Sequence, residues 1–553
     1  MPARQKNFLL RSSLLILLVV ALYGGALSHG FVWDDLYVIV ENPLLEKLGN
    51  IPRMFLAEDS IVGSTGYYRP VTYLSFALDR ALWGGDPAGF HGTNLLLHLV
   101  AVLLLQRVVA ELFRREELAF VAALLFALHP LANETVNFLA GGRNTLLCAS
   151  FSLLSLLCYL RNRRFLALCS FTVAIYSKEF ALLLPLLFFW HDRRTPSEKI
   201  RPGRYLPFLL SAGVYLLLRS SVLPRANFLG KVNLSDSTAA PYLVVRYLLN
   251  MISPWRLQVM YDIHPDVLSA ILCTLVIISL AAVVRIHRRE EALLPAACCF
   301  LLFLTPVVNI IPLESASLMA DRYAYFSLMG FSVLLATLLL KLGGRGVILA
   351  VALLCLFYAA IDLERNGIWK NEVSLYSRMT LDVPAKFDGF QNLGMYYYRK
   401  GELPRALENL ATALDKPEVP AGFLIGSGSV FWRAGMLDKG EEALLRAVRL
   451  EPGNPEPYLM LITLYQRNGN AEQARFWRER SEALFHDTEG MMKKKVVQLC
   501  NEGRGYLAKG LLTPAENVFW QALQIDPAYA PALSALEGVV AGQATVHGPG
   551  AMR

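Results

Sequence analysis

Long apolar runs separated by short charged segments fill residues 1–363, whereas residues 364–553 show the mixed spacing of soluble helices. A membrane-spanning helix needs about 20 apolar residues, and somewhat fewer when other helices surround it. Eleven runs fit this requirement, at 8–27, 92–112, 118–133, 144–160, 165–177, 179–191, 205–222, 266–286, 293–312, 323–341 and 345–363. The pattern predicts an all-α protein: a polytopic membrane bundle of about eleven spans, followed by a soluble helical domain.

Two apolar stretches leave alternatives open. Run 8–27 follows a basic N-terminus and also fits a cleaved signal peptide. We favour an uncleaved first span, because the residues after it resemble a loop that works beside an anchored helix. The stretch 241–257 is interrupted by Arg246, Asn250, Pro254 and Trp255. We therefore interpret it as an interfacial or re-entrant helix.

The charges of the loops support this count. If the N-terminus is cytoplasmic, the cytoplasmic loops are rich in Lys and Arg, as at 161–164 and 285–289. The first outer loop, 28–91, has four Lys and Arg against eight Asp and Glu. This asymmetry follows the positive-inside rule. Counting 241–257 as a span would place the basic loop 285–289 outside. The C-terminal domain is thus expected on the outer side.

Residues 364–540 contain a repeat. Gly401, Gly435 and Gly469 are 34 residues apart, and Gly510 follows after 41. Small residues recur five and twelve positions after the first and last of these glycines, at Ala406, Ala413, Ala515 and Ala522. A 34-residue period with a turn glycine and small residues at the helix crossing is the tetratricopeptide (TPR) signature. We predict about four TPR repeats, with residues 541–553 as a disordered tail.

Composition narrows the class of protein. Charged residues are 18% of the chain, below the roughly 25% of soluble proteins. The net charge of +8 is explained by basic cytoplasmic loops, and there is no basic stripe with interleaved aromatics, so we predict no nucleic-acid partner. The eight cysteines show no spacing typical of zinc sites or a disulfide framework.

Ionisable residues gather at the predicted outer ends of different spans. They are Asp34, Asp35, Arg69, His91, His129, Glu134, Arg143, Lys178, Glu179, Asp321 and Arg322. Carboxylates there could accept a proton from a nucleophile or bind a divalent cation, and Arg and Lys could hold a phosphate. Taken singly, each has a structural explanation: a helix cap or turn for the Asp pair, polar helix contacts for the face of His91, Asn94 and His98, and interfacial snorkelling elsewhere. Their convergence on one side indicates an active site.

With these motifs in order, the chain resembles the transmembrane and TPR-repeat-containing proteins, which are similar to the protein O-mannosyltransferases and share the C-type glycosyltransferase (GT-C) fold. The matching motifs are Phe31 to Asp35, Tyr68-Arg69-Pro70, Gly89-Phe90-His91 with Asn94 and His98, His129-Pro130 with Glu134, Gly142-Arg143, Lys178-Glu179 and Asp321-Arg322-Tyr323. Such enzymes transfer a sugar from a polyprenyl-phosphate donor to a hydroxyl, usually of a protein.

The resemblance implies roles for individual residues. Asp34 or Asp35 would be the catalytic base, and Glu134 would support the acceptor. Arg143, with Lys178 and Arg322, would contact the donor phosphate. Arg69, His91, His129, Glu179 and Asp321 would line the site. The family often has an acidic residue two positions after Arg143, where this chain has Thr145. No cofactor is required beyond the lipid-linked sugar, although a divalent cation at Asp34 and Asp35 is an open alternative.

Three functions are compatible with these residues. The first is a membrane glycosyltransferase that moves a mannose-like hexose from a polyprenyl-phosphate donor to a protein hydroxyl, with the TPR groove recruiting the acceptor. The second is a non-enzymatic TPR scaffold for envelope partners, and the third a lipid-linked sugar flippase or polymerase. We favour the first. We expect a multi-pass protein of a bacterial inner membrane with a periplasmic TPR domain, or a luminal one if it is eukaryotic.

Overall fold

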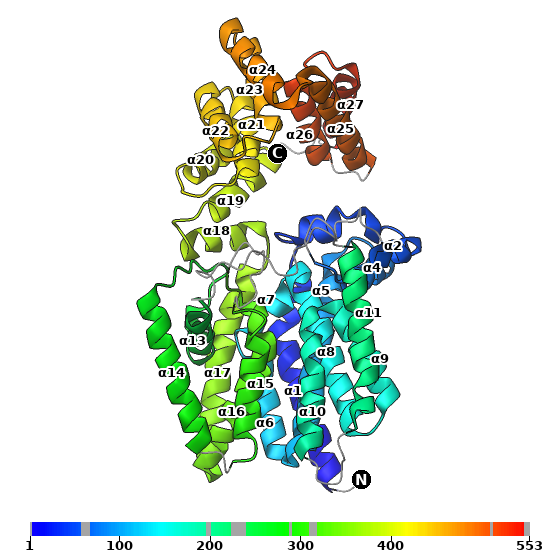
Figure 1. The fold of residues 1–553 in the computed structure, drawn as a ribbon, viewed down its shortest axis with the longest axis vertical. Coiled ribbons are helices and arrows are strands. Elements are labelled where there is room, and N and C mark those ends of the chain that lie inside the picture. Colours follow the sequence, from blue (N-terminus) through cyan, green and yellow to red (C-terminus); the bar gives the residue numbers. More distant parts are fainter. Residues whose placement is uncertain are drawn as a thin grey trace. The chain divides into compact units, whose positions relative to one another are not determined.

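The computed structural model describes residues 3–56, 67–194, 201–222, 239–286, 290–308, 318–508 and 512–546. Every regular element among them is helical, which confirms the predicted all-α class (Figure 1). The chain divides into two compact units, Met1–Arg378 and Met379–Arg553. The division falls after the position predicted from composition, because the last apolar helix continues to Ile368 and Trp369 is fully buried in the first unit.

Each of the eleven predicted runs overlaps a helix of the first unit. These helices are α1 (Ala3–Tyr23), α5 (Pro87–Phe113), α6 (Glu116–Leu128), α8 (Leu139–Leu160), α9 (Arg164–Ser177), α10 (Leu184–Arg194), α11 (Leu206–Val222), α14 (Val267–Ile286), α15 (Leu293–Leu304), α16 (Tyr325–Leu339) and α17 (Gly344–Ile368). In the described residues, six helices are long and apolar enough to cross a membrane, and four further apolar helices are shorter. The first unit is therefore a polytopic membrane domain, and the count of eleven spans stays a prediction.

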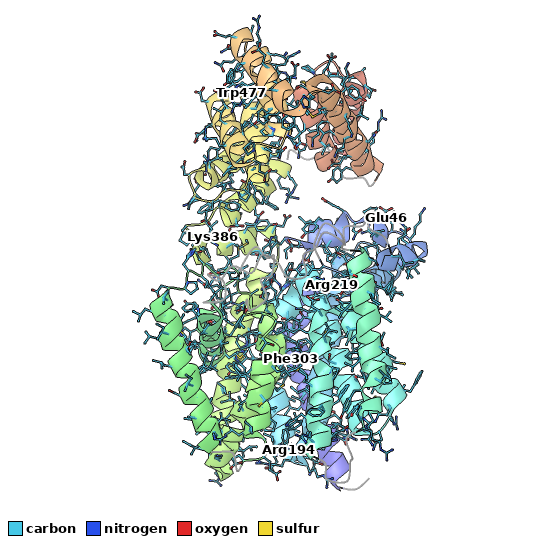
Figure 2. The ribbon with its side chains drawn as sticks, in the orientation of Figure 1. Glu46, Arg194, Arg219, Phe303, Lys386 and Trp477 are labelled. Atoms are coloured by element: carbon cyan, nitrogen blue, oxygen red, sulfur yellow. The ribbon has the colours of Figure 1, made fainter. Side chains whose placement is uncertain are left out.

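Burial differs strongly among these helices. Most of α8 is buried against α5 and α9, whereas the apolar side chains of α14 point outward along its length (Figure 2). An apolar face of that size is not stable in water, but lipid tails can cover it. The helix predicted at the interface is α13 (Ala239–Ile252), followed by the short turn η7 (Pro254–Arg256); its depth in a membrane stays a prediction.

Short elements collect at one end of the membrane helices. After α1 the chain forms short turns at Gly24–Ser28, Leu36–Val40, Pro43–Leu45 and Leu48–Asn50, then α2 (Ile51–Leu56) and α4 (Pro70–Trp83). The same end contains α7 (Ala132–Asn137), η5 (Glu179–Leu183) and η8 (Asp321–Ala324). In Figure 1 the helices α2, α4 and α7 lie together at this end. Segments far apart in the sequence are thereby brought into one region.

The second unit consists of paired helices. The segment α18 (Glu372–Asp382) precedes them, and the pairs are α19 (Asp388–Arg399) with α20 (Leu403–Leu414), α21 (Ala421–Arg433) with α22 (Leu437–Leu450), α23 (Glu456–Arg467) with α24 (Ala471–Phe485), and α25 (Thr488–Ala508) with α26 (Leu512–Ile525), before α27 (Ala530–Val546). Gly401, Gly435 and Gly469 each turn a pair with φ of +72 to +78°, a conformation that favours glycine.

Two details of this unit bear on the sequence predictions. The turn glycine Gly510 lies outside the described residues. Helix α27 continues to Val546, so the first part of the segment expected to be a disordered tail is helical, and 547–553 lie outside the described residues. Disorder of the rest of the segment 541–553 stays a prediction.

Candidate functional site

A cavity of about 440 Å³ lies at the end of the membrane domain where the short elements collect. Its volume falls in the range of small-molecule sites. Its wall is formed by Asp34, Tyr37, Val38, Tyr67, Arg69, Thr72, Tyr73, Ala140, Gly141, Asn144, Lys178, Glu179, Phe180, Pro306, Val307, Arg322 and Tyr323. Five of the eleven residues selected from the sequence are in this wall: Asp34, Arg69, Lys178, Glu179 and Arg322.

The two adjacent aspartates have different positions. Asp34 faces the cavity and is half-buried, whereas Asp35 is fully buried behind it. Both carboxylate oxygens of Asp35 accept backbone hydrogen bonds, from Val32 N at 3.1 Å and from Ala140 N at 2.7 Å. Asp35 therefore ties the loop after α1 to the start of α8, and only Asp34 can meet a ligand.

The carboxyl groups of Asp34 and Asp35 also differ in pKa. Burial raises the pKa of Asp34, and the nearby Arg322 guanidinium and Tyr37 hydroxyl oppose the rise. Burial raises the pKa of Asp35 further, to about 8, against the effect of its two backbone N–H partners. Asp35 is also fully buried, and both of its oxygens already accept backbone hydrogen bonds, so an acceptor hydroxyl has no access to it. Asp34 is the better candidate to accept a proton.

Three cations line the cavity in different states of pairing. Arg69 forms a bidentate pair with Glu179, at 2.7 and 3.2 Å. Arg322 is paired with Glu134, whose other oxygen accepts from the backbone N of Arg322 at 3.0 Å. Lys178 instead donates to the neutral Thr145 hydroxyl at 2.8 Å. Burial and the nearby Arg69 lower the pKa of Lys178 to about 7, so its ammonium form would gain most of the three from an anionic ligand in the cavity.

Arg143 lies outside the wall of the cavity, and its contact with the donor phosphate stays a prediction. Its guanidinium is fully buried and forms an ion pair with Asp79 at 2.7 Å. It also donates to Asn94 Oδ1, to the carbonyl of Phe90 and to Ser75 Oγ. All three guanidinium nitrogens thus have partners within the protein. Arg143 therefore holds α4, α5 and α8 together and cannot reach a phosphate in this structure.

Glu134 and Asp321 are also away from the cavity wall. Both oxygens of Glu134 are occupied by Arg322, so Glu134 positions that cation rather than acting on a substrate. Asp321 accepts from Arg365 at 2.8 Å and from the Tyr261 hydroxyl at 2.5 Å. This carboxylate therefore fastens η8 to α17 and to the segment after η7.

The two histidines predicted at the site are structural in this geometry. His129 Nδ1 accepts from Leu131 N at 3.1 Å, and its Nε2 donates to the carbonyl of Met251 at 2.9 Å. His91 is buried at the start of α5, with its Nε2 3.4 Å from the carbonyl of Gly30. Both rings brace turns near the cavity without lining it.

The surroundings of Asp34 do not fit a divalent cation. Within the described segments no group of three or more His, Cys, Asp and Glu side chains is close enough to hold a metal ion. The oxygens of Asp35 are occupied by backbone donors, and the other near groups of Asp34 are the guanidinium of Arg322 and a tyrosine. Among the described residues, Asp35 therefore offers no free oxygen with which the pair could bind a cation.

Several cavity residues escaped the sequence analysis. Tyr37, Tyr73 and Asn144 are in the wall, yet none is part of an evident charged motif. Tyr323 belongs to the motif Asp321-Arg322-Tyr323 and Tyr67 directly precedes Tyr68-Arg69-Pro70, but neither was selected as a site residue. The Arg69 and Arg322 guanidinium groups lie 4.2 and 4.9 Å from the rings of Tyr67 and Tyr323. A search for aromatic residues next to interfacial arginines would have found these two.

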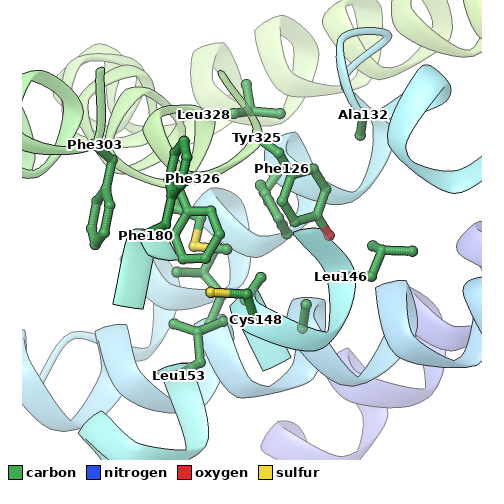
Figure 3. Close-up of a cluster of buried hydrophobic side chains, with 14 of the residues drawn as sticks. Phe126, Ala132, Leu146, Cys148, Leu153, Phe180, Phe303, Tyr325, Phe326 and Leu328 are labelled. Atoms are coloured by element: carbon green, nitrogen blue, oxygen red, sulfur yellow. The ribbon is translucent and has the colours of Figure 1, made fainter. Parts of the chain in front are cut away.

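An apolar cavity of about 120 Å³ lies deeper in the membrane domain, lined by α5, α8, α10, α15 and α16. Phe326 and Phe303 are in its wall, with ring centroids 5.0 Å apart. Phe180, in the wall of the polar cavity, has its centroid 5.5 Å from that of Phe326 (Figure 3). A continuous aromatic cluster thus separates the charged cavity from apolar space inside the bundle.

Comparison with known proteins gives a family match for part of the chain. Residues 70–222 match the family described as dolichyl-phosphate-mannose-protein mannosyltransferase. The matched range contains Arg143, Lys178 and Glu179, and it excludes Asp34, Asp35 and Arg322.

Curated relatives extend the similarity over most of the chain. A protein O-mannosyl-transferase of Caenorhabditis elegans is 28% identical over 446 residues, covering 72% of this chain and 62% of that protein. Human protein O-mannosyl-transferase TMTC3 is 22% identical over 601 residues, covering 93% of this chain and 64% of that protein. Mouse protein O-mannosyl-transferase TMTC1 is 38% identical over 147 residues, covering 25% of this chain and 16% of that protein. The chain thus spans less than two thirds of the length of these relatives. Their names confirm the resemblance that was inferred from the motifs.

Proposed function

We propose that this chain, which is similar to protein O-mannosyl-transferases over most of its length, is a membrane glycosyltransferase. It moves a mannose-like hexose from a polyprenyl-phosphate donor to a hydroxyl group of a protein acceptor on the outer face of the membrane. The observation that supports this most directly is one cavity that combines a carboxylate, Asp34, with the cations Lys178 and Arg322.

The geometry suits a single displacement. Asp34 accepts the proton of the acceptor hydroxyl while the hydroxyl oxygen attacks the anomeric carbon. The bond from that carbon to the phosphate oxygen breaks, and the polyprenyl phosphate leaves with the bonding electrons. Lys178 and Arg322 stabilise the charge that develops on the leaving group. Attack from the face opposite the phosphate inverts the anomeric configuration.

The donor's two halves need different surroundings, and the domain offers both. The phosphate and the hexose require charged and hydrogen-bonding groups, which Lys178 and the tyrosines of the cavity supply. The polyprenyl chain requires apolar surface, which begins at Phe180, Pro306 and Val307 in the same wall. A donor without the lipid would lose this part of its binding free energy.

The TPR-type unit is assigned to acceptor recruitment. Stacked helix pairs present an extended surface to a protein segment. We place this unit on the outer side, in the periplasm of a bacterium or the lumen of a eukaryotic organelle, from the positive-inside charges of the loops.

The test is transfer of labelled hexose from a polyprenyl-phosphate donor to an acceptor protein in reconstituted membranes. Asp34→Asn removes the charge with little change in shape, so transfer should fall about 10²–10⁴-fold, the usual contribution of a general base. Asp266→Asn, at an exposed helix start outside the cavity, is the matched control and should transfer normally. Full activity of Asp34→Asn would refute the base assignment. A wild-type protein inactive with every such donor would favour the non-enzymatic scaffold.

Lys178→Ala tests the phosphate site. Since Lys178 is the cation with no carboxylate in its hydrogen bond, its removal should raise the KM for the donor and lower kcat, while affinity for the acceptor stays unchanged. Lys178→Arg should restore part of the activity, because it keeps the charge but alters the geometry. Equal KM for the donor in Lys178→Ala and wild type would remove Lys178 from the phosphate site.

A further inference from the structure

Three aromatic rings stack beside the cavity without belonging to its wall. Trp33 and Phe138 have ring centroids 5.5 Å apart and planes inclined by 15°. Phe138 and Trp369 have the same separation and an inclination of 16°. The three rings come from the loop after α1, from the break between α7 and α8, and from the end of α17.

The stack touches both groups that the transfer needs. Trp33 directly precedes Asp34 and has φ of +54°, a left-handed conformation that is uncommon for a bulky residue and persists only when its surroundings impose it. Phe138 lies under the guanidinium of Arg322, 5.4 Å from ring centroid to the central carbon. A shift of Phe138 would therefore move both Asp34 and Arg322.

Trp369 is the fixed end of this stack. It is fully buried, caps α17, and does not line the cavity. The next residue, Lys370, accepts a hydrogen bond at its carbonyl from the N–H of Gly30, at 3.0 Å. The end of α17 thus holds the loop that carries Asp34 directly by one backbone hydrogen bond, and indirectly through the ring of Phe138, which stacks on both Trp369 and Trp33.

We propose that Trp369 is a positioning residue for the sugar transfer, which fixes Phe138 and, through it, the Asp34 loop and the guanidinium of Arg322. This assignment rests on the proposed function. Reacting groups displaced by about 1 Å can lose 10²-fold in rate. Trp369 directly follows α17, the last of the apolar helices of the first unit, so the carboxylate loop is anchored to the end of that helix.

The kinetic test compares substitutions at Trp369 in the full-length protein. Trp369→Ala should lower kcat roughly 10- to 100-fold. The KM for the donor should change less, because Lys178 is outside the stack. Trp369→Phe keeps an aromatic ring and removes no hydrogen bond, since the indole N–H has no partner within the described residues. It should recover most of the activity, whereas Trp369→Leu should not. Trp255→Ala, at a tryptophan that is 58% exposed, is the control and should behave as wild type.

A pH profile separates positioning from general destabilisation. The guanidinium of Arg322 lowers the pKa of Asp34, so a variant in which this cation moves away should show its acidic limb at higher pH. Trp369→Ala should shift the limb upward, and Trp369→Phe should leave it near that of wild type. A wild-type kcat and limb in Trp369→Ala would overturn the proposal. Equal losses in the Ala and Phe variants, with an unshifted limb, would also overturn it.

Hydrogen exchange of the segment 29–40 provides a readout without transfer. Trp369→Ala should speed hydrogen exchange of amides such as Gly30 N–H, whereas Trp369→Phe should leave their exchange as slow as in the wild type. If the wild type transfers no sugar, the proposed function fails and this measurement still judges the positioning contact. Unchanged exchange in Trp369→Ala would then overturn it.

Discussion

Asp34 and Asp35 are neighbours in the chain, yet the turn after Trp33 directs their carboxylates to different surroundings. Asp34 faces the charged cavity, and Asp35 is bound by the backbone N–H groups of Val32 and Ala140. The left-handed Trp33 sets this direction. At the scale of single residues, a charged motif therefore contains one group for chemistry and one that holds the loop.

Activity should depend on pH through Asp34. Burial raises the pKa of this carboxyl above its usual value near 3.8. A general base works only in its ionised form, so the rate should be lost as the pH falls through this raised pKa, and retained above it. The kcat profile should show an acidic limb above the range of an exposed aspartate, and Asp34→Asn should abolish the limb. A profile flat down to pH 4 in the wild type would contradict this.

Arg143→Ala should act on stability rather than on donor binding. It leaves the buried Asp79 without its ion partner, and breaking a buried pair in this way costs about 3–5 kcal/mol. The melting temperature in detergent should fall, and the double variant Arg143→Met with Asp79→Asn should recover part of the loss. Unchanged stability with a selective rise in the KM for the donor would return Arg143 to the phosphate site that the resemblance implied.

At the scale of elements, the membrane helices approach closely where glycine removes a side chain. A Cβ on Gly142 of α8 would lie 2.0 Å from the backbone oxygen of Thr135 in α7. A Cβ on Gly330 of α16 would lie 2.6 Å from Phe300 N and 2.7 Å from the oxygen of Ala296, both in α15. Backbone atoms cannot move aside as a flexible side chain does, so these glycines set the spacing between α7 and α8 and between α15 and α16.

Gly330→Ala should therefore destabilise the packing of α15 on α16. Overpacking of this kind usually costs about 1–3 kcal/mol, which thermal unfolding in detergent can measure. Gly213→Ala in α11 is the control, because a Cβ there meets nothing within 4 Å. The control should be neutral or slightly stabilising, since alanine favours a helix over glycine. Equal melting temperatures for both variants would mean that α15 and α16 separate at little cost.

At the scale of the whole molecule, the direction in which the chain crosses the membrane decides where the transfer takes place. Fusion of a reporter after Arg378, between the two compact units, should give activity on the outer side only, and fusion within 161–164 should report the cytoplasm. Cytoplasmic activity of the first fusion would reverse the topology and with it the side on which Asp34 works.

The sequence alone determined the helical class, the positions of the apolar helices and the 34-residue period of the repeat. The apolar runs and the 34-residue period are local patterns, and the energy of removing apolar surface from water acts on them directly. The ordered set of short motifs along the chain also indicated the family that it resembles. Five of the charged residues selected at the ends of spans line the cavity, including Asp34 and Lys178, and their roles stay predictions.

Only the tertiary structure decided which ionisable groups face the cavity and which brace it. Arg143, Glu134 and Asp321 have the same residue types and span-end positions as the cavity residues, but their partners come from helices distant in the chain. A buried charge must find a partner, and spacing in the sequence does not say whether that partner is a protein group or a ligand. The contact of Trp369 with Phe138 likewise exists only because α17 ends beside the loop after α1.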